Sequence, residues 1–145
     1  MTPDRRLAAA LLCGVTSAPL TWWLVGDLTS TRYPADHWDY SMRTPAALED
    51  ATPLVGVVCL AIAALAILVL MTSESPHPFV NPTLRLAGAG SLLGLAGRIA
   101  TKGYMGADIG GGPMVMLALG TAVYLTVSGV RRLTGVSRNH HGRQA

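Results

Sequence analysis

Three long runs of the sequence contain no Asp, Glu, Lys or Arg, and these runs limit the possible folds more than any other feature. They cover residues 7–26, 51–73 and 109–130 and are 20, 23 and 22 residues long. A bilayer core about 30 Å thick needs roughly 20 apolar residues per helix, so each run is long enough to cross it. Only 13% of the 145 residues are charged, about half the share in an average soluble domain. The sequence therefore predicts an integral membrane protein and argues against a soluble enzyme, a nucleic-acid-binding domain or a disordered chain.

A fourth span is less obvious, because Arg85 and Arg98 leave only 12 uncharged residues between them. A re-entrant or interfacial segment is the alternative. Long arginine side chains can reach the headgroups from inside the bilayer, so a helix over about 83–101 crosses if both arginines do so. With four spans and both termini in the cytoplasm, seven of the 11 Lys and Arg residues lie inside and four outside. This distribution follows the positive-inside rule and favours four spans.

We therefore predict an all-α fold, a bundle of four transmembrane helices with both termini in the cytoplasm. One membrane domain covers residues 1–132, with spans at about 7–26, 53–72, 83–101 and 113–130. Residues 27–50 are expected to form a long outer loop. The basic tail, residues 133–145, is expected to be disordered and to contact anionic lipid headgroups.

Three of the expected spans are preceded by a similar pair of residues. The pairs are Thr52–Pro53, Asn81–Pro82 and Gly112–Pro113. Thr, Asn and Gly can cap a helix, and proline suits the first helical position because its φ is fixed and it has no N–H to leave unbonded. The pattern predicts that these helices begin at the three prolines.

Small residues are spaced for close helix packing in the span over 83–101. Gly90 and Gly94 form one small-xxx-small pair, and Ala87 and Ser91 form another. Such a face lets two helix backbones approach closely in lipid. Its partner is either another helix of the same chain or a second copy of the protein.

Two ionisable residues are expected at the outer boundary of the membrane, Asp27 and Arg98. An ionisable group is costly there unless it is paired or reaches water. Each side chain can extend separately to the headgroups. If the spans over 7–26 and 83–101 touch, the two can instead form a structural ion pair.

The outer loops hold a candidate polar site formed by Asp36, His37 and Asp39, with Asp108 from the loop before the last span. Carboxylate oxygens and an imidazole nitrogen can bind a divalent cation or take part in catalysis. A solvated loop is the competing interpretation, because no second His or Cys accompanies them. No Gly-x-Ser-x-Gly or His-Glu-x-x-His motif occurs. We therefore assign no catalytic residue, no metal and no cofactor.

Two short segments suggest a relationship to known sequences. Trp23-Leu-Val-Gly-Asp27, together with Gly106-Ala-Asp-Ile-Gly-Gly110 before the last span, resembles uncharacterised small four-span integral membrane proteins of actinobacteria. The resemblance covers most of the chain. It implies a multi-pass protein of the bacterial plasma membrane and carries no known activity.

The expected function follows from a packable Gly/Ala helix with few polar groups near the membrane midplane. The leading hypothesis is a non-enzymatic accessory or scaffold subunit that acts through helix packing and its outer loop, on a membrane-protein partner or a second copy. The alternative is a small channel or transporter formed by oligomerisation through the Gly90–Gly94 face. A membrane enzyme using the outer polar residues is a third hypothesis. No nucleic-acid partner is expected.

Overall fold

The computed structural model describes residues 3–28, 44–72, 77–102 and 107–141, and these residues are almost entirely helical. They form four α-helices: α1 (Pro3–Val25), α2 (Ala46–Met71), α3 (His77–Thr101) and α4 (Ala107–His141). Three of them, α1, α2 and α4, contain segments long and apolar enough to cross a membrane. The predicted all-α fold is thus confirmed, and three of the four helices have the length and composition of a membrane span. The fourth helix, α3, has 25 residues and is about 37 Å long at 1.5 Å per residue, but its composition alone does not identify it as a span.

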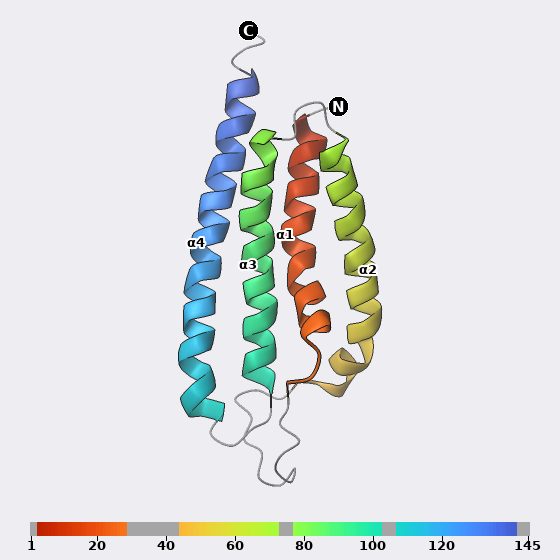
Figure 1. Ribbon diagram of the computed structural model, residues 1–145, viewed down its shortest axis with the longest axis vertical. Coiled ribbons are helices and arrows are strands. Elements are labelled where there is room, and N and C mark those ends of the chain that lie inside the picture. The colour runs from red at the N-terminus through yellow and green to blue at the C-terminus, as the bar shows by residue number, and fades with distance from the viewer. Residues whose placement is uncertain (1–2, 29–43, 73–76, 103–106, 142–145) are drawn as a thin grey trace.

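The four helices stand side by side in one layer, in the order α4, α3, α1, α2 (Figure 1). The inner helices α1 and α3 make the most extensive contact, α2 packs on α1, and α4 packs on α3. Successive helices run in opposite directions, so α1 begins and α4 ends at the same end of the layer. We call this the N/C end and the other the opposite end.

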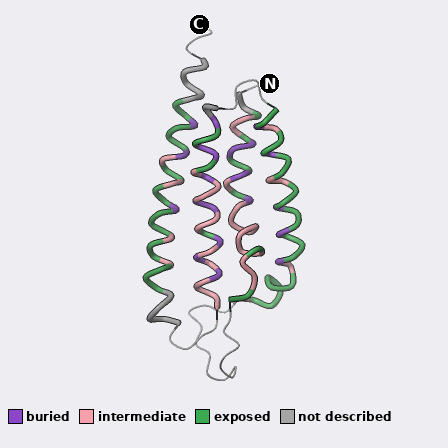
Figure 2. Tube along the Cα trace, viewed as in Figure 1, coloured by how far each residue is buried: buried purple, intermediate pink, exposed green. Residues whose placement is uncertain are grey.

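Burial follows the order of the helices. Buried and half-buried residues are concentrated on α1 and α3, whereas α2 and α4 are largely exposed (Figure 2). Exposed side chains on α2 and α4 include Leu54, at 70% exposure, and Leu117, at 74%. Large apolar side chains at this exposure are unfavourable in water and favourable against lipid tails. The burial pattern therefore agrees with a membrane environment for the two outer helices.

The buried core lies toward the N/C end and receives side chains from every helix. Small residues of α1 and larger ones of α2, α3 and α4 make up this cluster, which includes Ala10, Cys13, Leu70, Phe79 and Leu133. Because the α1 residues are small, the neighbouring helices can approach its backbone closely. The side chains of the other three helices therefore pack around the small residues of α1 at that end.

The helix starts predicted at the three prolines are wrong. The helices begin five to seven residues earlier, and the prolines lie inside them. In α2, Pro45 takes the N-cap position, and Thr52 donates its hydroxyl to the backbone oxygen of Leu48 at 2.7 Å instead of capping. The residues before Pro53 include Ala, Leu and Glu, which favour helix. Beyond the first turn a proline removes one backbone hydrogen bond and kinks a helix, and in a membrane bundle neighbouring groups can satisfy the freed backbone oxygen so that the helix continues.

Candidate functional site

The glycine face of α3 packs against α1 of the same chain. A Cβ atom added at Gly90 would collide with the backbone oxygen of Gly14, and one added at Gly94 would collide with that of Ala18. On α1, a Cβ at Gly14 would lie 2.9 Å from the Cβ of Leu86. These contacts leave no room for a side chain, so glycine is what allows the two inner helices to approach. Ala87 and Ser91, the other predicted packing pair, are half-buried.

Two tryptophans of α1 extend this close packing toward the opposite end. The ring of Trp22 occupies the space where a side chain at Gly97 of α3 would lie, and Trp23 does the same at Gly56 of α2. Each large ring is therefore accommodated by a glycine on a neighbouring helix. Both rings are thus packed between helices.

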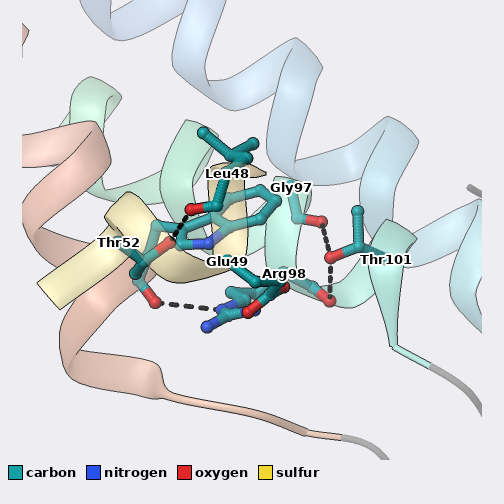
Figure 3. Close-up of polar contacts among 7 residues, drawn as sticks. Leu48, Glu49, Thr52, Gly97, Arg98 and Thr101 are labelled. Atoms are coloured by element: carbon teal, nitrogen blue, oxygen red, sulfur yellow. Dashed lines mark hydrogen bonds and ion pairs between the residues drawn. The ribbon is translucent and has the colours of Figure 1, made fainter. Parts of the chain in front are cut away.

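Arg98, near the end of α3, makes polar contacts with two neighbouring helices (Figure 3). Its Nε–H donates to the backbone oxygen of Trp22 at 3.1 Å, and its Nη1 donates to Oε1 of Glu49 at 3.0 Å. The guanidinium carbon also lies 4.9 Å from the centre of the Trp22 ring. Arg98 thus joins α3 to both α1 and α2. We call Arg98, Glu49 and Trp22 the arginine cluster.

The ends of the helices make this a favourable place for a positive charge. Trp22 lies in the last turn of α1, where backbone oxygens lack partners within the helix. The Arg98 side chain supplies such a partner and adds a cation at the negative end of the α1 dipole. Glu49 lies in the first turn of α2, where the dipole favours a negative charge. Both helix ends therefore support the ion pair.

The energetic contribution of these contacts depends on how far the two charged side chains are buried. The side chain of Arg98 is 8% exposed, while that of Glu49 is 43% exposed. An arginine at the centre of a membrane helix costs about 2.5–3.5 kcal/mol on insertion scales, and Arg98 lies away from the centre of α3, in its last turn. A cation–π contact contributes about 0.5–2 kcal/mol, and a charged hydrogen bond contributes about 1.5–3 kcal/mol. The three contacts together are large enough to offset the cost of burying Arg98.

The other arginine of α3 also bridges helices. Arg85 donates through Nε to Oδ1 of Asn81 at 3.0 Å, and through Nη1 to the hydroxyl of Ser128 on α4 at 2.9 Å. The two arginines that made the third span uncertain in the sequence are thus both engaged with side chains of the bundle.

An apolar cavity of about 250 Å³ adjoins the arginine cluster. Its walls come from α1, α2 and α3 and include Pro19, Trp22, Val55 and Leu93. Within the described residues, the indole N–H of Trp22 is buried without a hydrogen-bond partner. The Thr52 hydroxyl on the wall is bonded to its own helix. The cavity therefore offers apolar packing space beside the cluster, with the Thr52 hydroxyl bonded within its own helix and the Trp22 N–H left as its unbonded donor.

Several predicted site residues lie where the structure gives no side-chain geometry. Asp36, His37 and Asp39 lie outside the described residues. Asp108 lies in the first turn of α4, but its side chain is outside the described part. Among the described residues, no three His, Cys, Asp or Glu side chains are grouped closely enough to hold a metal ion. The outer polar site therefore stays a prediction.

Sequence reasoning missed Glu49 as a partner of Arg98. Asp27 is exposed just after α1 ends, and its predicted pair with Arg98 stays a prediction. A usable signal for Glu49 existed, since this acidic residue precedes the second span and was expected on the same side of the membrane as Arg98. It was overlooked because that segment was assigned to the outer loop instead of to the start of a helix.

Comparison of the chain with protein-family models, with curated proteins and with solved structures finds no match.

Proposed function

We propose that the chain is a non-enzymatic four-span protein of the bacterial plasma membrane, related to the actinobacterial proteins it resembles, that works as an accessory or scaffold subunit with both termini in the cytoplasm. The observation that supports this proposal most is the open helix layer. Each outer helix packs on one inner helix, and both carry exposed apolar side chains along their length. These two outer faces are available to a partner within the membrane.

The arrangement of α3 supports a fourth span. Arg85 and Arg98 are 13 residues apart, about 20 Å along a helix. In a bilayer core about 30 Å thick, each would start about 5 Å inside its boundary, a depth that an arginine side chain can bridge. Their hydrogen bonds to α4, α1 and α2 lower the cost of that position further. Four spans in turn place both termini on one side.

The polar contacts support a structural role more than a catalytic one. Both arginines of α3 are engaged in contacts between helices, and such contacts fix the positions of helices in a membrane. The alternative of a channel or transporter relied on self-association through Gly90 and Gly94. In the structure α1 occupies that face, so an oligomeric channel would need a different interface.

Site-specific photocrosslinking in native membranes tests the proposed function. A photoreactive amino acid is placed at Leu54 of α2 or at Leu117 of α4, both on the outer helices. Matched controls carry it at Val15 of α1 and Leu84 of α3, which are 72% and 66% exposed on the inner helices. We expect a discrete protein adduct from at least one outer position and lipid adducts alone from the controls.

Lipid adducts alone at all four positions would overturn the proposal, because a scaffold subunit must contact a protein. An adduct with a second copy of the chain would support self-assembly through an outer helix, and an adduct with another membrane protein would identify the partner. Protein adducts at the control positions and not at the outer ones would contradict the assignment of α2 and α4 as the docking helices.

A further inference from the structure

A groove lies between α1 and α2 near the N/C end of the layer. It has a volume of about 450 Å³ and is lined by apolar residues and one arginine, Arg5. Ala8 and Ala9 of α1 and Ala66 of α2 line it. Ala9 and Ala66 are 4% exposed and belong to the buried core, whereas Ala8 is exposed. The lining of the groove on α1 runs from Arg5 to Leu12, about 10 Å along the helix.

The groove has a charged end and an apolar body. Arg5 is exposed in the first turn of α1, where the unbonded N–H groups and the helix dipole also favour an anion. The next residue, Arg6, lies with its guanidinium carbon 5.9 Å from the centre of the Phe79 ring of α3. Asp4, Arg5 and Arg6 together carry a net charge of +1. Farther along, Leu12 and Leu65 form the apolar walls.

This order of groups corresponds to the chemistry of an anionic phospholipid. We propose that the groove binds one acyl chain of such a lipid between α1 and α2, with the lipid phosphate at Arg5. The inference does not depend on the proposed scaffold function. It requires only that α1 and α2 lie in a membrane, for which both have the length and composition. A membrane lipid meets the groove from the side, so the acyl chain enters without crossing water.

Native mass spectrometry of the purified full-length protein tests the proposal. The detergent-solubilised protein is mixed with equal amounts of phosphatidylglycerol and phosphatidylcholine, and the retained lipid is measured. We expect preferential retention of phosphatidylglycerol. In Arg5→Gln we expect that retention to fall about fivefold, since one arginine contributes about this factor near an anionic surface. Arg132→Gln, on the exposed surface of α4, removes the same charge elsewhere and should leave retention unchanged.

A second pair of variants tests the apolar part. Ala8→Trp places a ring in the groove and should reduce retention of both lipids, whereas Ala64→Trp, at an exposed position of α2 outside the groove, should not.

Glycerol phosphate added alone should not be retained, because it has no acyl chain. Equal losses in Arg5→Gln and Arg132→Gln would overturn the assigned headgroup site. Unchanged lipid retention in a folded Ala8→Trp variant would overturn the proposal that the acyl chain binds in the groove. Because Arg5 is exposed, its variant remains informative even if Ala8→Trp fails to fold.

Discussion

At the scale of single residues, the contact between α1 and α3 depends on which glycines face another backbone. Gly94 of α3 lies so close to the backbone of Ala18 that a methyl group does not fit, whereas a Cβ at Gly120 of α4 would meet nothing within 4 Å. Both are helical glycines, so alanine raises the intrinsic helix propensity of both positions equally. The difference between the two substitutions therefore isolates the packing effect.

We predict that Gly94→Ala lowers the free energy of unfolding by about 1–3 kcal/mol, the usual cost of overpacking. Gly120→Ala should leave it unchanged or raise it by up to about 1 kcal/mol. The measurement is denaturant or thermal unfolding in one detergent, with the two variants side by side. Equal effects would mean that the inner helices are not in close backbone contact.

The ion pair of Arg98 gives a second prediction at this scale. Glu49→Gln keeps the size of the side chain but removes the charge facing Arg98. Because Glu49 is partly exposed, the cost should exceed that of a surface pair and stay below the 3–5 kcal/mol of a fully buried one, at about 1–2 kcal/mol. Asp50→Asn, at the next and exposed position, should change the free energy of unfolding by less than about 0.5 kcal/mol. Similar losses of unfolding free energy in both variants would show that Glu49 has no specific role in stabilising Arg98.

At the scale of elements, the helices could be predicted from the sequence far better than their ends. The charge-free runs lie mainly within α1, α2 and α4, because a membrane span needs one long apolar segment and little else. The starts were misplaced because a Thr-Pro or Asn-Pro pair is compatible both with a helix start and with an early turn of a longer helix. In α2 the second possibility holds, because residues 46–51 are themselves helical and place Pro53 inside the helix.

The element whose role matters most is α3, which we expect to cross the membrane. In a background with the buried free cysteines Cys13 and Cys59 replaced by alanine, single cysteines are placed at Leu28, Thr72, Lys102 and Gly135. An impermeant maleimide should label Leu28→Cys and Lys102→Cys in intact cells, because α1 and α3 end on the same side. Thr72→Cys and Gly135→Cys should react only after lysis. Labelling of Lys102→Cys only after lysis, together with Thr72→Cys, would show that α3 does not cross.

At the scale of the whole molecule, the order of the helices could not be predicted from the sequence. Hydropathy locates the long apolar segments, but the choice of neighbours depends on which small residues meet across an interface. Gly14 and Gly90 place α3 beside α1, and this pairing separates α1 from α4 and leaves α2 at an edge. For the same reason the predicted glycine face could not be assigned to the chain itself or to a second copy in advance.

The proposed docking faces exist only if the four helices form an open layer with α2 and α4 at opposite edges. Electron–electron distance measurements between spin labels at Val57 of α2 and Val123 of α4, both exposed and near the middle of their helices, test it in lipid nanodiscs. A pair at Val15 and Val57, on neighbouring helices, provides the short reference distance. Three interhelical steps of about 8–10 Å predict a Val57–Val123 separation of about 24–30 Å. A separation of about 10–15 Å, equal to the reference pair, would indicate a closed bundle and contradict the account.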